Sequence, residues 1–190
     1  METIWRTSLG RAYERAIDSL AKPLRDCPDQ LWDAGLWEVR KDQPFVWPVR
    51  TVDGAYGDTA DQERLLQVCS AFWNVAYHAL FHLDFYLSGA VLPFAPPAPF
   101  REDEHHANVV PNRPYTRTEL QDYLAYDRQK ARATFATLTD EQAASPLPPD
   151  SQHAGRPFAD LLLLNLLHVQ EHAAHLGLFL GQRAGLPTTG

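Results

Sequence analysis

A long apolar stretch, FADLLLLNLLHVQEHAAHLGLFL, spans residues 158–180 near the end of the 190-residue chain. Its first half is apolar almost all round, which is typical of a helix buried at the centre of a helical protein. Pro157 stands where proline is favoured as a first helical residue, and Gly185 and Pro187 stand where helices commonly end. The sequence therefore predicts a central helix from about Pro157 to about Gly185–Pro187.

Three further segments carry the spacing of apolar residues that is typical of helices. The first runs from about Thr3 to Arg25 and is ended by prolines, after which residues 29–34 are expected to form a short turn. The second runs from about Asp58 to Ser88. The third begins at Thr116, which forms a capping-box pattern with Glu119, and continues to about Leu138.

The connections between these segments are rich in proline, glycine and aromatic residues. Residues 35–58 are expected to form an aromatic loop folded onto the helices, with weak support for a short strand pair. Residues 90–114 are predicted to be a long crossover loop, and loops of this length are usually functional or mobile. His105 and His106 in that loop could close over a site, although a solvated loop is the favoured interpretation. The expected fold is all-α: a single domain over residues 1–190, built as a four-helix bundle.

Composition restricts the partners of the chain. The formal net charge is −7, and no Lys/Arg-rich run appears, so neither nucleic acid nor an anionic membrane surface is expected as a partner. No secretory signal is visible, and the apolar stretches are too short or too polar to span a bilayer, so a cytoplasmic protein is expected. Cys27 and Cys69 lack nearby histidines in the sequence and are interpreted as buried or incidental thiols.

The residues best suited to chemistry are histidines on the predicted helices. His168 and His172 are four residues apart, so their imidazoles lie one turn above each other and could reach one metal ion. His175 and Glu171 share the same side of the helix, since a helix turns by about 100° per residue. A histidine on an apolar helix face is more often a hydrogen-bonded core residue than a ligand, so two histidines alone are weak support for a metal.

A third ligand is expected from the helix over residues 58–88. His78 and His82 are also four residues apart, and apolar neighbours would place His78 in a largely dry pocket. A neutral imidazole suits such a pocket when an ion takes its lone pair. Histidines from two buried helices strengthen the prediction of a divalent-metal site, because burying several imidazoles without partners is costly.

Two stretches carry a resemblance to a known family: YHALFHLDFYLS at residues 77–88 and HVQEHAAHL at residues 168–176. They resemble the DinB-like family, small metal-binding four-helix proteins related to thiol-dependent transferases. Carried over position by position, the resemblance implies that His78, His168 and His172 are the metal ligands. A competing alignment replaces His168 and His172 by Glu171 and His175, and this alternative remains open.

The resemblance also implies a function. Three protein ligands leave coordination positions open for water or substrate, which is the layout of a catalytic site. The family implies a metal-dependent enzyme, either a transferase that uses a low-molecular-weight thiol or a hydrolase, with zinc or nickel as the expected ion. Glu171 is the candidate general base, and His175 is expected to line the pocket or orient a bound water.

One alternative to that function remains open: a non-catalytic module that binds a small ligand and is stabilised by the metal. The state of assembly is a separate expectation. Relatives often pair, and the predicted helix face that bears Leu120, Tyr123 and Leu124 could serve a homodimer.

Overall fold

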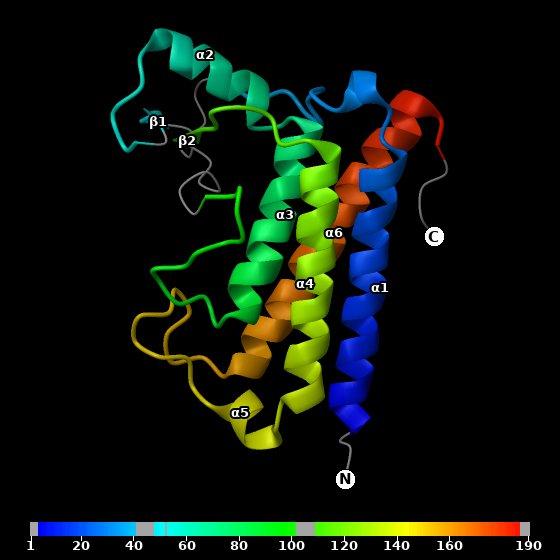
Figure 1. The fold of residues 1–190 in the computed structure, drawn as a ribbon, viewed down its shortest axis with the longest axis vertical. Coiled ribbons are helices and arrows are strands. Elements are labelled where there is room, and N and C mark those ends of the chain that lie inside the picture. The colour runs from blue at the N-terminus through cyan, green and yellow to red at the C-terminus, as the bar shows by residue number, and fades with distance from the viewer. Residues whose placement is uncertain (1–3, 41–47, 52, 102–108, 187–190) are drawn as a thin grey trace.

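The computed structural model describes residues 4–40, 48–51, 53–101 and 109–186. Four long helices lie side by side in this part of the chain (Figure 1): α1 (Ile4–Asp26), α3 (Phe72–Leu87), α4 (Arg117–Thr137) and α6 (Phe158–Ala184). The all-α prediction is confirmed. The expected loop histidines His105 and His106 lie outside the described residues.

Each long helix packs against two others. α1 and α3 each pack against both α4 and α6. Figure 1 shows that α1 and α6 run in one direction along the molecule, whereas α3 and α4 run in the other. The contact between α3 and α6, named here the α3–α6 seam, therefore lies across the four helices from the contact between α1 and α4, the α1–α4 seam.

The prediction of one helix over residues 58–88 is wrong. The structure has α2 (Thr59–Val68), a break, and then α3. At the break, backbone N–H groups of Phe72 and Trp73 donate to carbonyl oxygens of the segment before α2, at Ala34 and Trp32. Gly35 permits this approach, because a Cβ there would lie 2.8 Å from the Ser70 hydroxyl oxygen. A tertiary contact therefore overrides the helical pattern.

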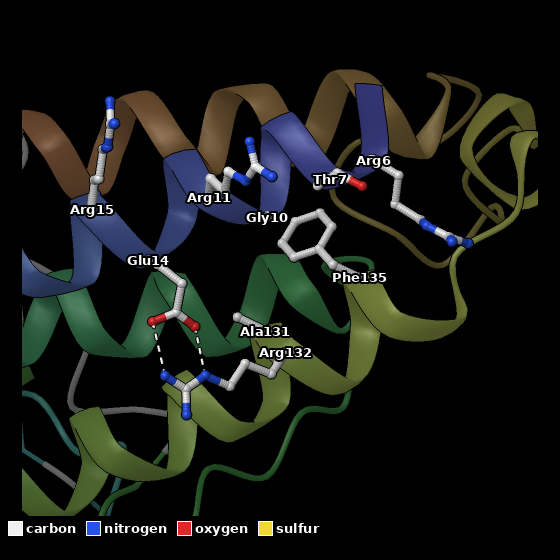
Figure 2. A pocket seen from close by; sticks show the side chains of 9 residues that line it. All are labelled: Arg6, Thr7, Gly10, Arg11, Glu14, Arg15, Ala131, Arg132 and Phe135. Carbon is white, nitrogen blue, oxygen red and sulfur yellow. Dashed lines mark hydrogen bonds and ion pairs between the residues drawn. The ribbon is translucent and has the colours of Figure 1, made fainter. Parts of the chain in front are cut away.

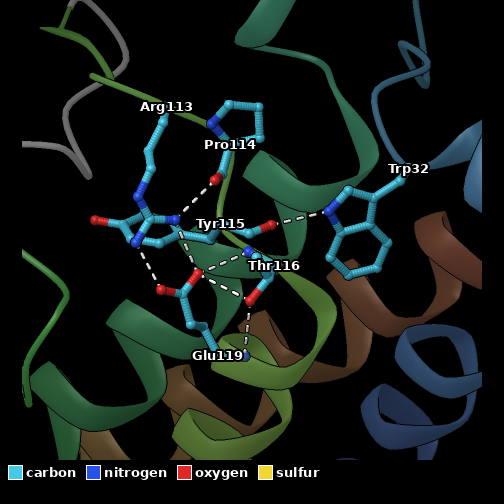
Figure 3. A network of polar contacts seen from close by, with 6 residues as sticks. All are labelled: Trp32, Arg113, Pro114, Tyr115, Thr116 and Glu119. Carbon is cyan, nitrogen blue, oxygen red and sulfur yellow. Dashed lines mark hydrogen bonds and ion pairs between the residues drawn. The ribbon is translucent and has the colours of Figure 1, made fainter.

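Local signals at the start of α4 act as predicted (Figure 3). The Thr116 hydroxyl accepts from the Glu119 N–H at 3.2 Å, and the Glu119 carboxylate accepts from the Thr116 N–H at 2.8 Å. The Arg113 guanidinium donates to both carboxylate oxygens of Glu119, at 2.9 and 2.6 Å. This pairing is the main reason why the pKa of Glu119 falls to about 2. The capping-box prediction is confirmed.

The ends of α6 agree with the sequence pattern. Pro157 is the N-cap rather than the first helical residue, and the helix ends at Gly185, which has a φ of 65°. That left-handed conformation favours glycine, because other residues carry a Cβ that clashes there.

Besides α2, four short elements accompany the long helices among the described residues. A short turn was expected after the first helix, and a 3₁₀ turn lies there at Asp29–Leu31. The helix α5 (Asp140–Ala144) was not predicted. The strands β1 (Arg50–Thr51) and β2 (Val109–Val110) pair in parallel. Within residues 35–58, Arg50 also forms a single antiparallel bridge with Tyr56, which is less than the strand pair that the sequence weakly suggested.

The core is built by the inner faces of the long helices. Leu120, Tyr123 and Leu124 are buried in it, so the predicted homodimer face on this part of the chain is wrong. The expected aromatic loop is only partly folded down, because Trp37 and Tyr56 remain 46% and 74% exposed. Among the helices of the described residues, none is long and apolar enough to cross a membrane.

A polar cluster lies inside the contact between α3 and α4. Asp84 of α3 accepts hydrogen bonds from the Lys130 ammonium and from the Tyr123 hydroxyl, the latter at 3.1 Å. Asp127 of α4 is fully buried, and within the described structure neither of its carboxylate oxygens has a hydrogen-bond partner. Burial, with a smaller effect of the Asp84 charge, raises the pKa of Asp127 well above its usual value.

Replacement of Asp127 by asparagine is expected to flatten the dependence of stability on pH. The folded-state pKa lies above the unfolded value, so the folded protein binds the proton more tightly and loses stability as the pH rises through the folded pKa. At pH 9, Asp127→Asn should therefore melt a few degrees higher than the parent protein. Each kcal/mol of unfolding free energy regained by removing the buried charge raises the melting temperature by ~2–4 °C. Thermal denaturation between pH 5 and 9 measures this. Asp122→Asn, at an exposed position of the same helix, is the control. If the melting temperatures of the two variants depend on pH in the same way, the raised pKa of Asp127 is contradicted.

Removal of the Glu119 side chain is expected to destabilise the start of α4. Glu119→Ala loses the reciprocal cap and the exposed Arg113 pair, which together are worth about 1–2 kcal/mol. Glu119→Gln keeps an acceptor for the Thr116 N–H and should lose less. Urea denaturation at pH 7 compares the two variants, and equal stability of Glu119→Ala and the parent would exclude a stabilising cap.

Candidate metal centre

Two buried hydrogen bonds hold α6 against its neighbours one turn before its first histidine. The Asn165 amide donates to the Leu83 carbonyl of α3 at 3.1 Å, and Asn165 is 0% exposed. The Tyr13 hydroxyl of α1 donates to the Leu162 carbonyl at 2.6 Å. These contacts fix the height of α6 relative to α3, and therefore the height of the histidines that follow.

Three histidines bring their Nε2 atoms together in the α3–α6 seam. The His168 Nε2 lies 3.2 Å from the His78 Nε2 and 3.1 Å from the His172 Nε2. These are the three ligands that the resemblance implied. A chain of hydrogen bonds cannot pass through the His168 Nε2, because a ring nitrogen carries either one hydrogen or one lone pair. The separations suit lone pairs that converge on one ion.

His82 joins the same cluster. One ligand atom from each of His78, His82 and His168 can be chosen so that all three lie within 4.8 Å of one another. The His82 ring centroid is 4.4 Å from that of His78 and 4.9 Å from that of His168. Two candidate triads therefore share His78 and His168. The group in which all three ligand atoms lie mutually close has His82 as its third member, whereas His172 is joined to the pair by its 3.1 Å approach to His168.

The rings of His168 and His172 are kept neutral. Burial is the first cause and lowers the pKa of each to about 4, with further contributions from the neighbouring His172 and His175 respectively. At pH 7 each ring therefore has one nitrogen lone pair available, which is the form that binds metal ions.

The outer nitrogens of two rings are not supported by hydrogen bonds. The Nδ1 atoms of His168 and His172 are buried and have no hydrogen-bond partner among the described residues. Metal-binding histidines usually donate this second N–H to a carboxylate or carbonyl, and losing that support typically costs 10–100-fold in affinity. Metal affinity at this centre would therefore depend on the converging Nε2 atoms themselves.

The rival ligands Glu171 and His175 lie at the solvent side of the cluster. Both side chains are exposed. The His175 ring centroid is 6.0 Å from that of His172 and 6.4 Å from that of Trp37. The group of converging ligand atoms, His78, His82 and His168, contains neither residue, and it does not contain His172 either. Their proposed roles as ligands, general base or water-orienting group remain predictions.

Tyr86 was missed by the sequence reasoning. Its ring centroid lies 5.2 Å from that of His82 and 6.2 Å from that of His168, so its ring flanks the cluster. Burial raises the pKa of its hydroxyl. A helical stripe at residues 78, 82 and 86 was the available signal, since positions four apart share one face.

The cysteines agree with their interpretation as unreactive thiols. Burial raises the pKa of Cys27 to about 12 and also raises that of Cys69. A thiol with a raised pKa carries little thiolate at neutral pH and is a poor nucleophile.

Single alanine variants should rank the four histidines. Because His78 and His168 belong to both triads, His78→Ala and His168→Ala should weaken Zn²⁺ binding by more than the roughly 100-fold upper range of a lost supporting contact. The loss in His172→Ala compared with His82→Ala then identifies the third ligand. Competition with a chromogenic zinc chelator measures each affinity. His153→Ala is the control outside the cluster. If His168→Ala binds Zn²⁺ as tightly as the parent protein does, His78 and His168 are not a pair of ligands to one ion.

The resemblance to the DinB-like family remains a prediction. No family model, curated protein or solved structure matches the chain. The histidine cluster is therefore the feature of the chain that indicates a function.

Proposed function

We propose that the protein binds one divalent metal ion through His78, His168 and His172, with the long helices forming a four-helix bundle of the DinB-like kind. On this proposal the protein is a metal-dependent enzyme that acts on a small molecule. The two candidate reactions are transfer to or from a low-molecular-weight thiol and hydrolysis. A cytoplasmic location and a homodimer belong to the same proposal.

The separation of the Nε2 atoms is the observation that carries this proposal. Imidazole nitrogens bind zinc at about 2.0–2.1 Å, which places two ligands about 3.3 Å apart at a tetrahedral angle and about 2.9 Å apart at a right angle. The separations of 3.1 and 3.2 Å fall between these two values. Each of these two pairs, His78 with His168 and His168 with His172, has a separation suited to sharing an ion.

The residues present suit zinc or nickel. Imidazole is a good ligand for both ions, and affinity and availability, rather than the ligand set alone, decide between them. Neutral histidines leave the charge of the ion uncompensated, so a bound ion would supply strong polarisation of a water, a thiol or a carbonyl. The side chains of Glu171 and His175 are exposed, so on this proposal either could exchange protons with solvent.

A non-catalytic module is the second candidate. It is favoured by the composition of the cluster, since the group of converging ligand atoms consists of histidines alone and contains no carboxylate that could act as a base. In such a module the ion would stabilise the α3–α6 seam, and a small ligand would bind at its open side.

Metal analysis followed by ligand titration tests both candidates. Protein purified without chelators should contain close to one equivalent of zinc or nickel, and added Zn²⁺ should raise the melting temperature of the metal-free protein, because an ion that binds only the folded state stabilises it. Absence of metal together with no stabilisation by Zn²⁺ or Ni²⁺ would overturn the metal site.

The enzyme and the module differ in their response to thiols. The metal-loaded protein would be titrated with bacillithiol, mycothiol and glutathione, and assayed for transfer to electrophilic acceptors and for ester and amide hydrolysis. A thermal shift with one thiol, and turnover that disappears in His168→Ala, would support the transferase. Bound metal with neither a thiol effect nor turnover would favour the module.

A further inference from the structure

A cavity of about 480 Å³ opens along the α1–α4 seam, across the four helices from the histidines. Its apolar lining includes Gly10 of α1 and both Ala131 and Phe135 of α4. Figure 2 shows the Phe135 ring lying in the gap between the two helices. The volume lies within the range of about 300–1,000 Å³ that is usual for small-molecule sites.

The polar part of the lining is strongly basic. It consists of Thr7, one carboxylate, Glu14, and four arginines, Arg6, Arg11, Arg15 and Arg132. These side chains give the cavity a formal charge of +3, although the whole chain carries −7. A local positive potential against an acidic background points to an anionic ligand.

The charge of +3 already includes Glu14, whose carboxylate is engaged by two arginines. It accepts from Arg132 at 2.6 and 3.1 Å and from Arg128 at 2.7 Å, and the Arg132 hydrogen bond is the main reason why its pKa is lowered. Figure 2 shows the Arg132 guanidinium facing the Glu14 carboxylate. The pair therefore forms a fixed wall of the cavity.

Arg11 and Arg15 are the arginines left to bind a ligand. In Figure 2 the Arg15 side chain extends away from Phe135, so it would have to turn toward the cavity to reach a ligand beside that ring. Both arginines are exposed, and neither forms an ion pair with any residue that the structure describes. Their positions four apart place them on one face of α1. Arg6 adds a third guanidinium, of which one nitrogen donates to the Leu138 carbonyl at 3.0 Å.

We propose that this cavity binds a small organic anion with a flat apolar body. Its phosphate or carboxylate head would lie on Arg11 and Arg15, since guanidinium groups match the geometry of both anions. The apolar body would lie against Phe135 and Ala131. The site is separate from the histidine cluster and does not depend on the metal.

Calorimetric titration with matched probes tests the chemistry of the ligand. 1-Naphthyl phosphate and 1-naphthoate carry both the anionic head and the apolar body, whereas inorganic phosphate and 1-naphthol each lack one of them. Either naphthyl anion should bind at least about tenfold more tightly than both partial probes, and the tighter of the two identifies the preferred head. No saturable binding of either anion at millimolar concentration, or equal binding of 1-naphthol, would overturn the proposal.

Variants then locate the binding. Arg11→Gln/Arg15→Gln should weaken binding of the preferred anion about tenfold, since each half-exposed contact contributes up to about 1 kcal/mol. Arg156→Gln/Arg183→Gln removes the same charge from exposed positions outside the cavity and should have little effect. His168→Ala should bind the anion as the parent does. If both arginine double variants lose the same affinity for the anion, or if His168→Ala loses affinity while Arg11→Gln/Arg15→Gln does not, the anion binds elsewhere and the proposal is overturned.

Discussion

The antiparallel contact between α3 and α6 is the constraint on which the histidine cluster depends. Each helix supplies two imidazoles one turn apart, and neither pair alone could hold an ion firmly. The buried amide of Asn165 bonds to the Leu83 carbonyl and sets the register between the helices. A shift of one residue along α6 would rotate its face by about 100° and separate His168 from His78.

Where the fold follows from local chemistry, the sequence predicts it well. The capping box at Thr116 and the left-handed Gly185 need only their own helices, so both ends could be identified from neighbouring residues. The break before α3 could not, because it is made by hydrogen bonds from Phe72 and Trp73 to a segment more than one helix away. Nothing in the apolar spacing of residues 58–88 signals those contacts.

The candidate site shows the same division. Spacing alone brought His168 and His172 onto one face, and the structure places their Nε2 atoms 3.1 Å apart. The third member was harder to define, since His78 and His82 both fit the spacing and the choice depends on side-chain rotamers and helix rotation. Glu171 illustrates the limit of a helical wheel: it shares the side of His168 in projection, yet it is exposed in the structure.

Crystallographic anomalous scattering at the absorption edge of the bound metal tests the central claim most directly. The account predicts one strong peak in the α3–α6 seam, about 2.0–2.2 Å from a ring nitrogen of both His78 and His168. The third protein ligand would be read from the same map as His172 or His82. A metal-soaked crystal with no peak in the seam, or with a peak bound by Glu171 and His175 and not by His168, would contradict the account.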